Sequence, residues 1–109
     1  MDEEKVLDPS LGTTLKIHVG SGLGNNLTLD DVDFNCKFFT TYNRGITINK
    51  GDARMLPLGD GTYIAVVPTR EVGTGIYQMR LTAYLPDTDV PGGIREEVVT
   101  IDTKIPVRP

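Results

Sequence analysis

The sequence predicts an all-β fold in which two antiparallel sheets of about seven short strands form a sandwich. Apolar and polar residues alternate in several segments, and clusters of Gly, Asn and Asp separate these segments. No window of eleven or more residues carries a helical apolar stripe. The 109 residues suit one domain that folds without metal or disulfides. We expect residues 13–105 to form the sandwich, with tails at 1–12 and 106–109.

Two segments in the first half of the chain alternate most clearly. The first predicted strand turns three apolar side chains inward and two polar ones outward: Leu15, Ile17 and Val19 against Lys16 and His18. The second has an apolar face of Val32, Phe34, Cys36 and Phe38 and an opposite face of Asp33, Asn35, Lys37 and Phe39. Both patterns indicate strands with one buried face.

Three further strands are shorter. Ile46 and Ile48 open one strand, and Met55 to Leu58 forms another. Gly59-Asp60-Gly61 is a hairpin signal, because these residues tolerate the positive φ angles that such turns need. The strand that follows, Thr62 to Val67, is apolar on both faces. This indicates a strand with cover on each side.

The longest strand follows a connection from Pro68 to Gly75, in which we expect one helical turn. Its inward side chains are Tyr77, Met79, Leu81, Ala83 and Leu85, and its outward ones include Gln78, Arg80 and Thr82. A loop from Pro86 to Gly93 leads to a last strand at about Arg95 to Ile105, which we expect to insert Val99 and Ile101 into the core. Pro106 and Pro109 are expected to end regular pairing.

The segment Gly73-Thr74-Gly75-Ile76-Tyr77, with the alternating strand after it, resembles the penultimate strand of immunoglobulin-like domains. The resemblance covers Gly59 to Ile101 best, and it implies an immunoglobulin-like β-sandwich. It also implies that the Tyr77 hydroxyl ties the preceding connection to the strand, as a tyrosine corner. The chain departs from the antibody pattern in having no Trp and only one Cys, so antigen-receptor ancestry is not implied.

A second resemblance rests on residues spread along the chain: Leu29, Asp33-Phe34, Phe38, Gly61-Thr62-Tyr63 and Gly73 to Tyr77. With these residues the chain is similar to small sandwich proteins of prophages and mobile elements of gut bacteria, and to the N-terminal sandwich of phage baseplate or tail-fibre proteins. This resemblance implies a structural virion component that acts by assembly. It places the chain in the virion, or in the bacterial cytoplasm before assembly.

Composition and charge restrict the classes of partner. Fifteen acidic and eleven basic residues give a formal net charge of −4, and the basic residues are scattered singly. We therefore expect neither nucleic acid nor an anionic membrane as the partner. No apolar run approaches the ~20 residues that span a bilayer, so membrane insertion is not expected. The acidic N-terminus shows no signal-peptide pattern.

Residue types also limit the possible chemistry. One histidine (His18), two serines (Ser10 and Ser21) and one cysteine (Cys36) leave few catalytic constellations, and we predict no enzyme and no cofactor. His18 is expected to point outward and Cys36 inward, where a thiol is inert. The glycine-rich loop at 20–24 lacks the following helix that a phosphate-binding loop requires, which favours a plain connection.

Carboxylates in two loops leave a cation site open as an alternative. Asp30, Asp31 and Asp33 precede the second strand, and Asp87 and Asp89 lie in the loop before the last one. Calcium prefers six to eight oxygen ligands, and a sandwich could bring the two loops together. Their spacing does not match an EF-hand, so solvated turn carboxylates are the preferred interpretation.

The remaining candidates are interaction residues: Phe39, Ile64, Val66, Tyr84, Asp87 and Asp89. Phe39 and Tyr84 are predicted to project outward, from strands expected to belong to different sheets. These residues favour a non-catalytic module that assembles with a protein partner or with itself. The alternative is a bacterial cell-surface module that recognises carbohydrate or protein through its loops.

Overall fold

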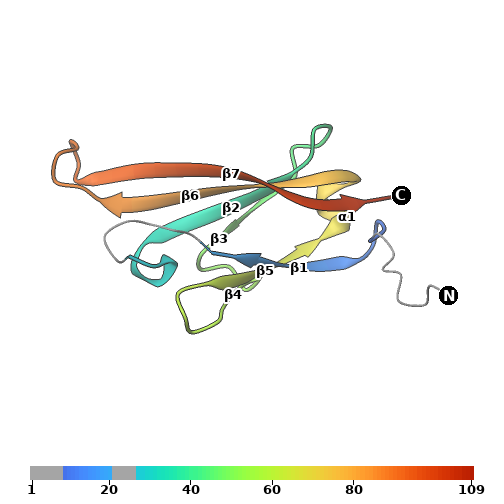
Figure 1. Ribbon diagram of the computed structural model, residues 1–109, viewed down its shortest axis with the longest axis horizontal. Coiled ribbons are helices and arrows are strands. Elements are labelled where there is room, and N and C mark those ends of the chain that lie inside the picture. Colours follow the sequence, from blue (N-terminus) through green and yellow to red (C-terminus); the bar gives the residue numbers. More distant parts are fainter. Residues whose placement is uncertain (1–8, 21–26) are drawn as a thin grey trace.

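The computed structural model describes residues 9–20 and 27–109, and it confirms an all-β sandwich (Figure 1). Within these residues the elements are β1 (Thr14–Val19), η1 (Leu29–Asp31), β2 (Asp33–Phe39), β3 (Ile46–Asn49), β4 (Met55–Pro57), β5 (Tyr63–Pro68), α1 (Thr69–Val72), β6 (Gly75–Pro86) and β7 (Ile94–Val107). One sheet has the order β1-β5-β4 and the other has the order β3-β2-β6-β7. All strand pairs in both sheets are antiparallel. Neither short helix in the described part is long and apolar enough to span a membrane.

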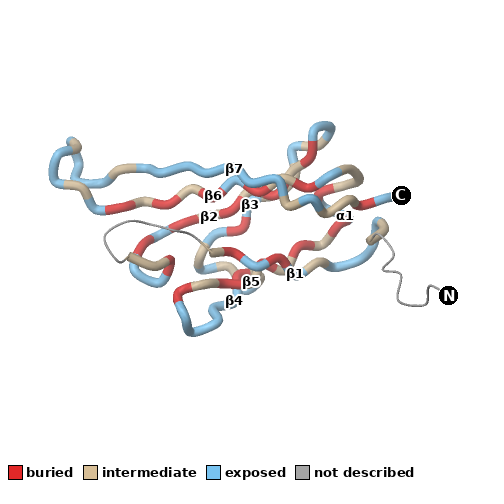
Figure 2. The backbone as a smooth tube through the Cα atoms, viewed as in Figure 1, coloured by how far each residue is buried: buried red, intermediate tan, exposed pale blue. Residues whose placement is uncertain are grey.

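The core lies between the two sheets, and the predicted alternation decides which side chains enter it. Figure 2 shows buried residues on β1, β2, β5 and β6, the strands at the middle of the two sheets and beside them. The predicted inward residues of β2 and β6 are all buried, and Cys36 and Phe38 are fully so. The predicted outward residues are half-buried or exposed. Because the side-chain period of a strand is two, a correct alternation also gives the correct face.

Hydrogen bonds hold the connection from β5 to β6 in place. The Tyr77 hydroxyl donates to the Gly73 carbonyl over 2.6 Å, which is the bond that the sequence predicts for this tyrosine. The Thr69 hydroxyl donates to the Thr13 carbonyl over 2.6 Å and accepts from the Gly12 N–H over 2.8 Å. The predicted helical turn in this connection is α1. These bonds fix where the chain passes from one sheet to the other.

Strands β6 and β7 form a long hairpin that runs along the 56 Å dimension of the molecule (Figure 1). The prediction that Val99 and Ile101 enter the core is wrong. They lie opposite Leu81 and Met79 and so share the core-facing side, yet they are 48% and 39% exposed. The reason is that the opposing sheet has three strands against four, so no buried layer covers the β7 edge.

Strand β7 also continues further than the sequence predicts. It ends at Val107, and Pro106 lies opposite Ile76 in the ladder, so the proline does not end the pairing. Proline is tolerated there because β7 is an edge strand, where a missing N–H breaks no second ladder. The register shifts between Ile76 and Gln78, and Lys104 opposite this bulge has a φ of 58°.

Candidate interaction surface

Phe39 and Tyr84 lie on the same sheet, which corrects the prediction that their strands belong to different ones. Strands β2 and β6 are neighbours, and the register places Phe39 opposite Gln78 and Tyr84 opposite Asp33. Both aromatic rings therefore project from the outer face of the four-stranded sheet. Six residues of strand separate the two positions, which is about 20 Å. They occupy opposite ends of one face.

An open groove of about 410 Å³ lies at the Tyr84 end of this face. Its lining comes from the start of β2, the end of β6 and the start of β7: Asp31, Val32, Asp33, Tyr84, Pro86 and Ile94. Local bonds hold both carboxylates in place, since Asp31 accepts from the Thr28 N–H over 2.8 Å and Asp33 accepts from the Phe34 N–H over 3.0 Å. The groove combines apolar walls with negative charge.

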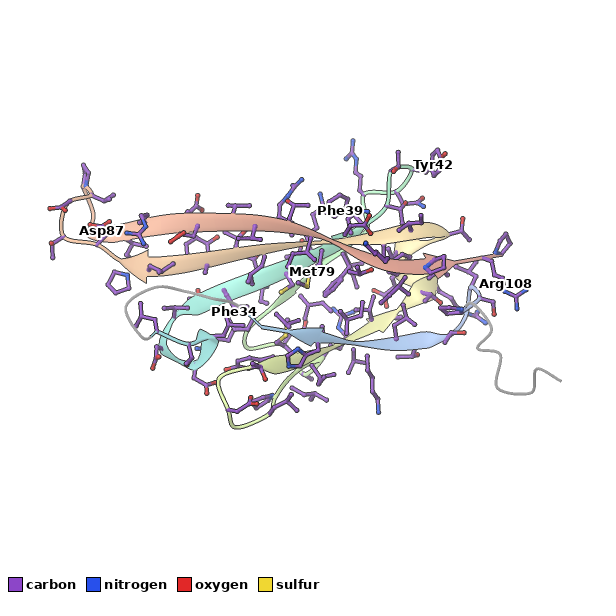
Figure 3. All side chains as sticks on the ribbon, in the orientation of Figure 1. Phe34, Phe39, Tyr42, Met79, Asp87 and Arg108 are labelled. Carbon is purple, nitrogen blue, oxygen red and sulfur yellow. The ribbon has the colours of Figure 1, made fainter. Side chains whose placement is uncertain are left out.

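The Phe39 end of the face is basic. The Lys37 ammonium lies 5.5 Å from the centre of the Phe39 ring, and the Arg80 guanidinium carbon lies 5.1 Å from it. Cations at such distances are attracted to the negative face of an aromatic ring. Figure 3 shows Phe39 on the side of the sheet that faces away from the second sheet. Two cations therefore flank Phe39 on the outer face, whereas two carboxylates lie in the groove beside Tyr84.

Ile64 and Val66 lie on the outer face of the other sheet, far from Phe39 and Tyr84. In the register, Ile64 lies between His18 and Leu56, and Val66 lies opposite Lys16. Both side chains are half-buried, so this face of β5 is only partly covered, contrary to the prediction of cover on each side. The predicted interaction residues thus fall on two opposite faces and do not form one patch.

Asp87 and Asp89 stabilise the tip of the β6–β7 hairpin, where Figure 3 shows Asp87. Asp87 accepts from the Asp89 N–H over 2.9 Å and pairs with the Arg95 guanidinium over 2.7 Å. These two contacts hold the pKa of the Asp87 carboxyl below its usual value, with the backbone bond as the larger cause. Arg95 also pairs with Glu97 over 3.0 Å.

The two acidic loops approach each other but form no cation site in the described part of the chain. Asp31 and Pro86 line one groove, so the expected proximity of the loops is real. The Asp30 carboxylate, however, accepts from the Tyr63 hydroxyl over 2.6 Å. Residues 9–20 and 27–109 contain no group of three or more histidine, cysteine, aspartate or glutamate side chains placed to hold a metal ion.

The other residues considered for chemistry lie where the sequence predicts. His18 is exposed on β1. Cys36 is fully buried on β2, and burial raises the pKa of its thiol to about 12. A thiol with so high a pKa is a poor nucleophile at neutral pH. Of the glycine-rich loop at 20–24, residues 21–24 lie outside the described residues.

Strand β7 carries exposed apolar side chains that the sequence prediction missed. Figure 2 shows most of β7 as exposed, and four of its side chains are large and apolar: Ile94, Val98, Val99 and Ile101. Ile94 and Val98 share the outer face with Tyr84, whereas Val99 and Ile101 share the core-facing side. The adjacent apolar residues Val98 and Val99 were the sign of this exposure in the sequence. Adjacent apolar residues in a strand make both faces apolar, and only one face can meet the core.

Comparisons with protein-family models, with curated proteins and with solved structures gave no match to this chain.

Proposed function

We propose that this chain is a non-catalytic protein-interaction module with an immunoglobulin-like strand arrangement, which acts by assembly through the edge of β7. The observation that carries the proposal is the length and exposure of this edge. β7 has 14 residues, and in the described part of the chain the strand with which it pairs is β6. Arg108, directly after β7, makes an isolated bridge with Ser10. A long edge with exposed apolar side chains is a template for pairing with another chain.

The strand order supports the immunoglobulin-like part of the proposal. Constant-type immunoglobulin domains place strands B, E and D in one sheet and C, F and G in the other. Taking β1 as B makes the first sheet B-E-D and the second C′-C-F-G. The Tyr77 hydroxyl bond at the connection from E to F supports the same arrangement. The further proposal of a phage or prophage virion component rests on the sequence motifs alone.

The other sheet edges are shorter than the β7 edge. Strand β3 has four residues, and β4 has three and ends in Pro57. Strand β1 has six residues and carries Lys16 on its outer face. Short strands, prolines and lysines are the usual means by which proteins prevent edge pairing. On β7 such features lie toward both ends, with the charges of Arg95 and Glu97 on the core-facing side and Lys104 and Pro106 near the C-terminal end. They leave the segment 98–101 without a charge.

A site-specific photo-crosslinker tests the proposal. We would replace Val99 on β7 with a benzophenone amino acid and irradiate cells that express the chain. Lys16, exposed on the outer face of β1, is the matched control position. The proposal predicts a discrete protein adduct from position 99, of either the chain itself or another protein, and none from position 16. Equal or absent adducts at the two positions would contradict it.

The groove beside Tyr84 supports a second candidate, a ligand-binding module of the cell-surface type. Its volume is in the range of small-molecule sites, and it combines an aromatic ring with two carboxylates. An aromatic face can stack on a sugar ring, and carboxylates accept from sugar hydroxyls. A glycan-array screen of the wild type and of Tyr84→Ala tests this candidate. It requires binding that the substitution removes.

A further inference from the structure

We infer that the partner of the β7 edge is a second copy of this chain, paired antiparallel with the first around a two-fold axis at Thr100. The inference rests on the proposed function, because it names the partner of the same edge. A two-fold interface is self-complementary, so the sequence of β7 must suit its own reverse. Each possible position of the axis places different residues of the two copies opposite each other, so the charges and apolar residues of β7 distinguish between these positions.

The possible axes are few. An axis perpendicular to the continuous sheet passes through one residue and keeps each copy's side chains on the same face. With the axis at Thr100, Val99 lies opposite Ile101 of the second copy, and this apolar pair occurs twice. Both residues are exposed in the single chain and project on the core-facing side. Apolar residues directly opposite each other in an antiparallel pair stabilise the pairing.

On the outer face, the same axis places no two like charges opposite each other. Thr100 faces Thr100 of the second copy, and Asp102 faces Val98. Beyond these pairs, Glu96 points toward the segment that carries Lys104, which has the opposite charge. No two like charges therefore meet within the paired segment 98–102.

Shifting the axis by one or two residues loses this complementarity. An axis at Val99 places Glu96 opposite Asp102 twice, and an axis at Asp102 places that carboxylate opposite itself. Like charges directly opposite each other are destabilising. An axis at Val98 places Glu97 opposite Val99 and Arg95 opposite Ile101. An axis at Ile101 leaves Val99 without an apolar residue opposite it. Among axes at positions 98 to 102, only the axis at Thr100 keeps Val99 opposite Ile101 and also avoids like charges opposite each other.

The bulge in β7 ends the pairing between the two copies. Lys104 has a φ of 58°, and the register of β7 shifts beside it. Beyond the bulge, Val107 is buried against the chain's own core, and Arg108 is bridged to Ser10. With the axis at Thr100, regular pairing therefore runs from Val98 to Asp102 of each copy and no further.

Cysteine crosslinking tests the register. Around an axis at Thr100, the two copies of residue 100 lie opposite each other, with Cα atoms ~5 Å apart. This distance suits a disulfide, whose Cα atoms lie roughly 4.4–6.8 Å apart. The two copies of residue 98, or of residue 102, are offset by four positions, about 13 Å. Thr100→Cys should therefore crosslink, and Val98→Cys and Asp102→Cys should not. All three positions point to the outer face and are half-buried or exposed, so the variants are matched.

The measurement is the yield of covalent dimer, of twice the 11.9 kDa chain mass, after mild oxidation. Thr47→Cys, exposed on β3, gives the yield from random collision, and Cys36 remains because it is buried. The inference predicts a yield for Thr100→Cys at least tenfold above the other three variants. A higher yield at position 98 or 102, or a collision-level yield at all positions, would overturn it. If photo-crosslinking at Val99 then still captures a different protein, the proposed function survives without this inference; if it captures nothing, both fail.

Discussion

Removing one hydroxyl group from the core should lower the stability of this sandwich substantially. Tyr77 is fully buried, and its hydroxyl donates to the Gly73 carbonyl over 2.6 Å. Tyr77→Phe keeps the ring but leaves that carbonyl without this donor. Gly73 is half-buried, and its carbonyl loses the donor that the buried tyrosine supplies, a loss that costs about 1–3 kcal/mol. For a domain of this size, each kcal/mol lowers Tm by about 4–8 °C, so we expect a fall of roughly 5–20 °C.

Thermal and urea unfolding, followed by circular dichroism at neutral pH, measure this effect. Tyr42→Phe is the matched control, because Tyr42 is 85% exposed and should tolerate the change with less than about 0.5 kcal/mol of effect. The urea m-value should stay constant, since the surface exposed on unfolding hardly changes. If Tyr77→Phe melts within about 1 °C of Tyr42→Phe, the hydroxyl bond does not stabilise the connection between the sheets and our reasoning is wrong.

Three further predictions follow from the core and the turns. Gly45→Ala should cost about 3 kcal/mol or more in urea unfolding, because Gly45 has a φ of 72° and an added Cβ would overlap a backbone carbonyl of β2. Gly59→Ala, with a φ of 88° but open space around it, should cost only about 1 kcal/mol, and equal costs would contradict the clash. Burial raises the pKa of the Cys36 thiol to about 12, which lowers its thiolate fraction at pH 8 roughly 1,000-fold. A higher-pKa thiolate is intrinsically more nucleophilic, so reaction with a disulfide reagent should be at least ~100-fold slower in the folded than in the unfolded chain. The pKa values of Tyr63, raised mainly by its hydrogen bond to a carboxylate, and of Tyr77, raised by burial, are about 12 against an ordinary 10. The folded state therefore keeps protons that the unfolded state loses, and stability should be complete below pH 10 and fall between pH 10 and 12; a flat profile there would refute this.

The faces of the strands could be predicted from the sequence because alternation is a local property. Phe34, Cys36 and Phe38 are buried as expected, and the outward position of Phe39 also follows from it. The Tyr77 hydroxyl bond was predictable too, since it depends on a short motif and joins residues four apart.

The composition of each sheet could not be predicted in the same way. The pairing of β2 with β6 joins residues 39 to 51 positions apart in the sequence, and alternation does not say which strands are neighbours. The groove needs Asp31 and Ile94 together, which only that pairing provides. The exposure of Val99 and Ile101 was missed for a related reason. Alternation gives the direction of a side chain but not whether another layer lies opposite it.

Solution mass shows whether the open edge of β7 associates with a second copy of the chain. Light scattering coupled to size exclusion would compare the wild type with Val99→Lys over a tenfold range of concentration. Val99 is half exposed, so lysine should leave the fold intact. We predict that the wild-type mass rises toward twice 11.9 kDa with concentration, while the variant stays at the single-chain mass. A wild type that remains a monomer over the whole range, or a variant that associates equally well, would rule out pairing through the β7 edge.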